Sequence, residues 1–148
     1  MENAGRRCMN GVAVVKRGEW GERVAAWWLE SKGFEIVERN SRPCAFDRRL
    51  EIDIVAKDKS TGTLVFVEVK QHARRTEFQR RLRSVDSRKK ALLLRACRAW
   101  MRREKWYGPH RFDVIEIYGE PGGGKTEIDH IERVRLFVKP SLFVNWYE

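Results

Sequence analysis

The chain has 148 residues, of which 42% are hydrophobic and 11% aromatic, enough for one domain with a buried core. Its net charge is +10 at pH 7. It contains no run of about 18 apolar residues, which excludes a transmembrane helix. The apolar run from Val12 to Val15 is too short for a secretory signal. We therefore expect a cytoplasmic protein without a membrane partner.

The excess positive charge is concentrated in one segment. Residues 74–105 contain thirteen Lys and Arg against three Asp and Glu, so this window carries a net charge of +10 and the rest of the chain is balanced. A localised basic segment suggests a polyanionic partner such as nucleic acid. The alternative explanation is a solvated helix face.

Helical periodicity predicts a first helix at residues 19–33. Its wide apolar stripe predicts that Trp20, Trp27 and Trp28 pack in the core. Glu22 recurs at helical spacing with the apolar residues of this stripe, so we expect it above the buried side. A carboxylate in that position is either paired or functional.

Five strands and a second helix are predicted after the first helix. The strands are expected at 34–40, 50–58, 63–71, 111–119 and 131–138, and the second, basic helix at 88–106. This order predicts an α/β domain over residues 17–138, preceded by a loose tail at 1–16 and followed by a tail at 139–148.

The predicted hairpin between the second and third strands carries charges for which an apolar hairpin has no structural need. A four-residue turn at 59–62 fixes the register and places Asp53 directly opposite Glu68. In the same register Glu51 lies opposite Lys70, and these two can pair as ions. Facing carboxylates about 5 Å apart repel each other. A divalent cation removes the conflict, because Mg²⁺ or Mn²⁺ prefers oxygen ligands. The alternative explanation is an exposed hairpin face whose charges merely alternate.

The segment from Gly119 to Thr126 fits the phosphate-loop pattern GxxxxGK[ST]. A phosphate loop is followed by a helix, whereas the residues after Thr126 alternate as a strand does. A flexible loop between two strands is therefore the favoured interpretation, and nucleotide binding is the alternative.

Asp53 followed by Glu68-Val69-Lys70 resembles the PD-(D/E)XK signature of restriction-endonuclease-like nucleases. Further blocks resemble, in the same order, the YraN-like family of bacterial proteins, distant relatives of Holliday junction resolvases. These blocks are Gly21-Glu22, Gly33-Phe34, Asn40-Ser41-Arg42, Glu51-Ile52-Asp53, Phe66 to Lys70, and Arg111-Phe112-Asp113-Val114.

The resemblance implies a restriction-endonuclease-like core, a mixed β-sheet flanked by helices, and Mg²⁺- or Mn²⁺-dependent hydrolysis of nucleic acid. Asp53, Glu68 and Glu22 would then be metal ligands, and Lys70 would orient or activate the attacking water. The implied substrate is DNA rather than RNA, including branched repair or recombination intermediates. The resolvase relatives suggest a homodimer by analogy.

Cationic side chains around the hairpin and on the basic helix are expected to contact the nucleic acid. These are Arg42, His72, Arg74, Arg75, Arg95, Arg98 and Arg102. The alternative to a nuclease is a non-catalytic nucleic-acid-binding protein that keeps the nuclease fold, since it needs the basic helix but has no use for Asp53 opposite Glu68.

Overall fold

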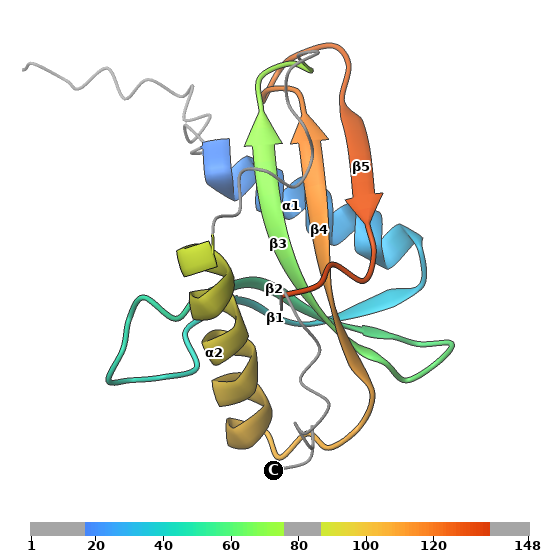
Figure 1. The fold of residues 1–148 in the computed structure, drawn as a ribbon. Coiled ribbons are helices and arrows are strands. Elements are labelled where there is room, and N and C mark those ends of the chain that lie inside the picture. The colour runs from blue at the N-terminus through green and yellow to red at the C-terminus, as the bar shows by residue number, and fades with distance from the viewer. Residues whose placement is uncertain (1–16, 76–86, 137–148) are drawn as a thin grey trace, which may run out of the picture.

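The computed structural model describes residues 17–75 and 87–136 (Figure 1). The tails expected at 1–16 and 139–148 lie outside the described residues. None of the described helices is long and apolar enough to cross a membrane. The elements follow the order α1 (Arg17–Ser31), β1 (Phe34–Ser41), β2 (Ile52–Asp58), β3 (Leu64–His72), α2 (Ser87–Arg103), β4 (His110–Tyr118) and β5 (Glu127–Ile131).

The five strands form one mixed sheet in the order β1-β2-β3-β4-β5. β3 and β4 are parallel, with α2 in the connection between them, and the other neighbouring strands are antiparallel. Figure 1 shows α1 crossing behind β3, β4 and β5, while α2 lies on the other face of the sheet. This α/β architecture confirms the predicted fold class and is that of a restriction-endonuclease-like core.

Alternation along the central strands produces two separate cores. Val65 and Val67 of β3 face α1 and pack with its Leu29, whereas Phe66 faces α2 and packs with Trp100. β3 is therefore covered on both faces, as its apolar composition predicts.

A β-bulge in β1 helps to place α2. Val37 is the extra residue at the bulge and is 45% exposed. The bulge turns Glu38 toward α2, where its carboxylate accepts hydrogen bonds from Trp100 Nε1 at 2.7 Å and from the guanidinium of Arg103. Trp100 also packs edge-on against Phe66, with ring centroids 5.7 Å apart. α2 is thus fixed to both β1 and β3.

The last strand begins earlier in the chain than predicted. β5 spans Glu127–Ile131, and residues 132–136 follow it outside any strand. The reason is the short loop at 119–126, which lets Glu127 pair with Tyr118 at the end of β4. Because a strand and not a helix follows this loop, the hairpin-loop interpretation of the GxxxxGK[ST] segment is confirmed.

The expectation that Trp27 packs in the core was wrong, because its side chain is 64% exposed. α1 buries a narrower face than its apolar stripe suggests, formed by Ala25, Ala26 and Leu29. The small alanines allow α1 to lie close to the sheet, and this geometry leaves Trp27 on the outer side.

Candidate metal centre

The β2–β3 hairpin has the register that its turn predicts. Cα partners run from Lys57 and Leu64 to Ile54 and Val67. Gly62 completes the turn with a φ of 73°, a conformation that glycine adopts without steric cost.

β2 and β3 separate directly beyond this ladder, at Asp53 and Glu68. Beyond the ladder a side chain replaces the backbone acceptor: the Asp53 Oδ2 accepts a hydrogen bond from the Val69 N–H at 2.8 Å. β2 remains paired with β1 as far as Ile52 and Ser41, and β3 remains paired with β4 to its end. Each strand is therefore held on its outer side, and the two carboxyl groups lie at a fixed fork.

The fork changes the protonation of its carboxyl groups. Burial, followed by the charge of Glu68, raises the pKa of Asp53 to about 8, although the Val69 N–H opposes the shift. Without a cation at pH 7, Asp53 is therefore mostly protonated and shares a hydrogen bond with Glu68. Asp53 keeps this proton because a second negative charge beside Glu68 is unfavourable. A divalent cation could replace the proton, since the two carboxyl groups supply oxygen ligands.

Glu22 approaches the fork from α1. Gly21 lies against Gln71 of β3, where an added Cβ would meet the Gln71 Cβ at 3.2 Å, so glycine permits this close approach. Burial raises the pKa of Glu22, and a hydrogen bond with Asn40 opposes the increase. The charge of Glu22 in turn contributes to the raised pKa of Asp53. The structure thus brings the helix carboxylate into electrostatic contact with the fork.

Lys70 lies two residues beyond Glu68 on the same face of β3. Burial lowers the pKa of Lys70, and the neighbouring ammonium of Lys89 adds to the decrease. The carboxylates of Glu68 and Glu116 act in the opposite direction. A half-buried lysine beside a carboxylate pair is suited to hold a water or a phosphate oxygen near a metal.

Sequence reasoning missed Glu116, which is only 3% exposed and is the Cα partner of Lys70 on β4. Its Oε2 accepts a hydrogen bond from the Tyr118 hydroxyl at 2.8 Å. His72 stacks on Tyr118 with ring centroids 5.1 Å apart, and its Nε2 lies 3.9 Å from Glu116 Oε1. The available signal was one carboxylate on a strand face that is otherwise apolar and aromatic.

Sequence reasoning also missed Lys89, in the first turn of α2. Its Nζ lies 2.7 Å from Glu68 Oε1. This hydrogen bond raises the pKa of Lys89, and the charges of Asp53 and Glu51 contribute to the increase. A cation from the chain itself therefore lies at the carboxylate pair.

A cleft of about 340 Å³ opens between the hairpin and α2. Glu51, which precedes β2, forms an ion pair with Arg42 at 3.6 Å. The ladder ends at Ile54 and Val67, so Glu51 and Lys70 are not Cα partners in it as the register predicted. The cleft combines three carboxylates with three cations: Glu51, Asp53 and Glu68 with Arg49, Arg88 and Lys89.

The predicted nucleic-acid contacts on α2 lie outside its apolar face. The side chain of Arg95 is 54% exposed, with its guanidinium 3.4 Å from Asp47 of the β1–β2 loop. Arg102 is exposed and Arg98 is half-buried. These side chains recur at helical spacing and form a basic surface along α2, which begins at the cleft with Arg88 and Lys89.

Arg75 differs from the arginines of α2, because carboxylates of β5 engage it. Its guanidinium lies 3.0 Å from both Glu127 and Asp129, and 4.2 Å from the ring centroid of Tyr118. Hydrogen bonds to these carboxylates hold the pKa of Arg75 above its usual value. Its neighbour Arg74 is exposed.

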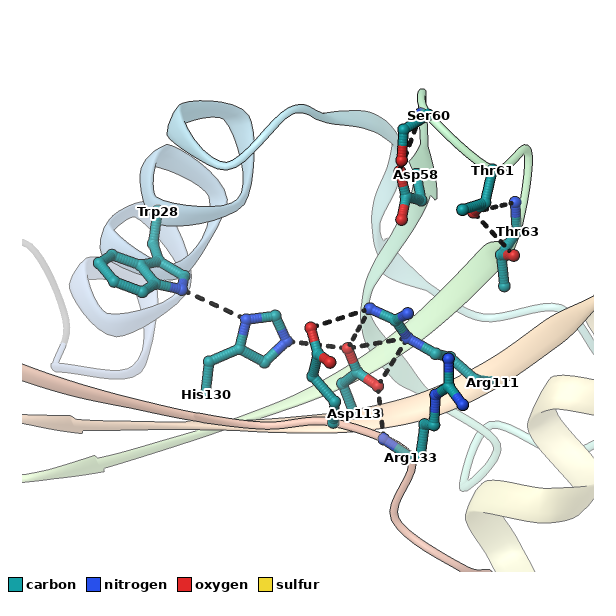
Figure 2. Close-up of polar contacts among 10 residues, drawn as sticks. Trp28, Asp58, Ser60, Thr61, Thr63, Arg111, Asp113, His130 and Arg133 are labelled. Atoms are coloured by element: carbon teal, nitrogen blue, oxygen red, sulfur yellow. Dashed lines mark hydrogen bonds and ion pairs between the residues drawn. The ribbon is translucent and has the colours of Figure 1, made fainter.

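A second polar cluster lies where α1, β4 and β5 meet (Figure 2). Asp113, His130 and Glu132 have ligand-type atoms within 4.8 Å of one another, a spacing that could hold a metal ion. Arg111 already supplies a positive charge there, at 3.1 Å from Asp113 and 3.3 Å from Glu132. His130 Nε2 lies 2.8 Å from the fully buried Asp113.

The tautomer of His130 also disfavours a metal in this second cluster. The Trp28 indole N–H donates to His130 Nδ1 at 3.3 Å, so Nδ1 carries the lone pair and Nε2 carries the proton. Nε2 then donates to Asp113 and has no lone pair for a cation. We interpret the cluster as a structural network that ties α1 to β4 and β5.

Comparisons with known proteins agree with the family resemblance of the sequence. The model of a family described as "Uncharacterised protein family UPF0102" matches residues 21–117. A UPF0102 protein of Corynebacterium efficiens is 38% identical over 120 residues, covering 80% of this chain and 91% of the relative. One from Deinococcus radiodurans is 38% identical over 120 residues, covering 80% and 93%. One from Methylibium petroleiphilum is 39% identical over 105 residues, covering 70% and 84%. The chain therefore belongs to the UPF0102 family, the YraN-like family that its sequence blocks resemble.

Proposed function

We propose that the protein is a metal-dependent nuclease that hydrolyses phosphodiester bonds in DNA. The observation that carries this proposal is the fork between β2 and β3. There the carboxyl groups of Asp53 and Glu68 lie together where the strands separate, and Asp53 accepts a hydrogen bond from the Val69 N–H. Lys70 follows Glu68 on the same face of β3. The proposed cofactor is Mg²⁺ or Mn²⁺, with Asp53, Glu68 and Glu22 as its protein ligands.

Each residue of the fork has a distinct role in this proposal. A divalent cation held by the carboxylates would lower the pKa of a bound water and offset charge on the phosphate. Lys70 would orient or activate that water, and the carboxylate of Glu116, its Cα partner on β4, favours the charged form of the Lys70 ammonium. The water oxygen would form a bond to phosphorus as its proton passes to solvent, the bond to the leaving oxygen would break, and that oxygen would take up a proton from solvent.

The basic surface supports a nucleic-acid substrate. Cations line the cleft beside the carboxylates, and Arg95 and Arg102 extend the basic surface along α2. Cations at these places can bind phosphates on either side of the scissile bond. The proposal includes DNA in preference to RNA, branched repair or recombination intermediates, and a homodimer, all of which follow from the family resemblance. It also includes a cytoplasmic location, which follows from the short apolar run at 12–15.

A non-catalytic nucleic-acid-binding protein is the second candidate. The ion pair between Lys89 and Glu68 favours it, because the chain's own lysine balances one of the fork's charges. The basic surface of α2 also forms without a metal. Under this alternative, Asp53→Ala leaves DNA affinity unchanged or makes it stronger, and no cleavage exists to be lost.

The test is a cleavage panel with the purified full chain on single-stranded, duplex, flap and four-way DNA and RNA, with Mg²⁺ or Mn²⁺. We expect Asp53→Ala and Lys70→Ala to lower cleavage by about 100-fold or more while nucleic-acid binding persists. Asp58→Ala, which removes a half-buried carboxylate at the far end of β2, is the matched control and should cleave like wild type. If no substrate is cut and Asp53→Ala binds Mn²⁺ as wild type does, the proposal is wrong.

A further inference from the structure

We propose that Lys89 is an internal counterion of the fork that competes with the divalent cation and is displaced when the cation binds. This inference rests on the proposed function, since it takes Asp53 and Glu68 as the metal ligands. It adds a residue of α2 that controls how readily the metal binds.

The geometry allows Lys89 to leave without disturbing the fold. Glu68 is fixed on the central strand, and its side chain is only 8% exposed, whereas the Lys89 side chain is 51% exposed. The ammonium therefore enters the cleft from the solvent side and lies 2.7 Å from Glu68 Oε1. α2 is anchored elsewhere, by Trp100 and the apolar residues around it.

Electrostatics make Lys89 and a divalent cation competitors. Both are attracted by the same carboxylates, and Lys89 also interacts with the charges of Asp53 and Glu51. A cation bound to Glu68 would lie within a few ångströms of the ammonium, where two positive charges repel strongly. Metal binding therefore has to release Lys89, and by linkage Lys89 lowers metal affinity by the factor with which it stabilises the metal-free fork.

The released ammonium has a second use at the cleft. Arg49 and Arg88 line the same cleft, so Lys89 would move toward a phosphate lying there. A phosphate of the bound substrate gives the displaced ammonium a new partner. A metal in the fork takes over its contact with Glu68. Substrate and metal therefore favour each other's binding through Lys89. In the absence of both, the Lys89 ammonium stays beside Glu68 and neutralises its charge.

The experiment measures Mn²⁺ affinity by calorimetry without nucleic acid, in the full-length wild type and in Lys89→Gln. Lys90→Gln is the matched control, since Lys90 adjoins Lys89 in the same turn, and Asp53→Asn identifies binding at the fork. We expect Lys89→Gln to bind Mn²⁺ about three- to tenfold more tightly, the loss of one partly exposed competing ion pair. Lys90→Gln should stay within about twofold of wild type, which is the scale of an effect without a direct contact.

A second readout uses heat denaturation of the same variants. Lys89→Gln should lower Tm in EDTA and leave it unchanged at saturating Mn²⁺, because wild-type Lys89 has then already left Glu68. A Tm loss of equal size in both conditions overturns the inference.

The outcomes separate this inference from the proposed function. If wild type shows Mn²⁺ binding that depends on Asp53, but Lys89→Gln binds equally or more weakly, the counterion role is refuted and the metal centre stands. If no variant shows binding that depends on Asp53, both are refuted.

Discussion

Replacing Asp53 with asparagine is expected to stabilise the metal-free protein relative to wild type, and to do so more at pH 9 than at pH 5. Asparagine is the replacement of choice because its side-chain oxygen can still accept the hydrogen bond that the Val69 N–H donates to Asp53. The change thus removes the ionisable group at the fork and preserves the hydrogen bond that holds the strand ends.

The sign follows from the direction of the pKa shift. The pKa of Asp53 is about 8 in the folded protein against 3.8 for the free side chain. Between these values the folded state keeps a proton that the unfolded state has lost, so wild-type stability decreases as pH rises. Asp53 contributes its full stability below about pH 4, and this contribution is lost as pH rises through about 8. The Asp53→Asn variant has no such loss, because the amide does not ionise.

The size of the stability difference follows from the pH range between the folded and unfolded pKa values of Asp53. Each pH unit in which the two states differ by one proton changes the free energy of unfolding by about 1.4 kcal/mol. The range from pH 5 to about pH 8 therefore sets an upper limit of about 4 kcal/mol. The strands separate at the fork, so ionised carboxylates can rotate apart and take up water. We expect Asp53→Asn to gain on the order of 2 kcal/mol on wild type between pH 5 and pH 9.

Urea unfolding in EDTA, followed by tryptophan fluorescence, measures this gain, since the chain has six tryptophans. Asp58→Asn is the control. Hydrogen bonds from Ser60 lower the pKa of Asp58, so its contribution is lost only as pH falls below about 4 and is constant between pH 5 and pH 9. Saturating Mg²⁺ at pH 9 should restore wild-type stability and leave Asp53→Asn unaffected. An equal effect of Asp53→Asn at both pH values would refute the carboxylate fork.

Three further predictions concern residues around the fork. Lys70→Gln should slow single-turnover cleavage by about 100-fold without weakening Mn²⁺ binding in calorimetry; weaker binding would make Lys70 a support of the metal ligands instead. Combined charge reversal at Arg95 and Arg102 should weaken DNA binding and reduce the slope of log affinity against log salt by about two, whereas Arg75→Gln, whose charge β5 already balances, should not change that slope. Asp113→Ala should cost about 3 kcal/mol of stability in urea with Mn²⁺ affinity unchanged, and a reduced affinity would place a cation at the second cluster.

The carboxylate pair could be predicted from sequence because the relevant information is local. A four-residue turn determines the register of the hairpin, and strand alternation determines which side chains share a face, so Asp53 opposite Glu68 follows from counting. The opening of the ladder at this pair could not be predicted in the same way. It depends on β1 holding one strand and β4 holding the other, and both pairings involve residues distant in sequence.

The wrong or missing predictions also concern features that depend on contacts between residues distant in sequence. Helical periodicity shows that Trp27 belongs to an apolar stripe, but how much of the stripe is buried depends on how α1 packs on the sheet, through Ala25, Ala26 and Leu29. Polar and apolar residues alternate both at 127–131 and in the residues that follow, so either segment could form the last strand. Pairing of Glu127 with Tyr118 selects the earlier segment. Lys89 was part of a recognised basic segment, yet its contact with Glu68 depends on where α2 packs.

The hairpin and the basic helix are distant in sequence, and the fold brings their opposite charges together on one face of the sheet. Bare carboxylates at the fork would repel a phosphate, and basic side chains alone would bind it without activating water. The fold sets the hairpin's carboxylates against the first turn of a basic helix, so that a cation of the chain itself lies beside Glu68. Lys89 balances the charge of Glu68 in the metal-free protein, and a divalent cation would balance it during hydrolysis. Under our proposal, the exchange of one positive charge for the other would link the arrival of substrate to the assembly of the metal centre.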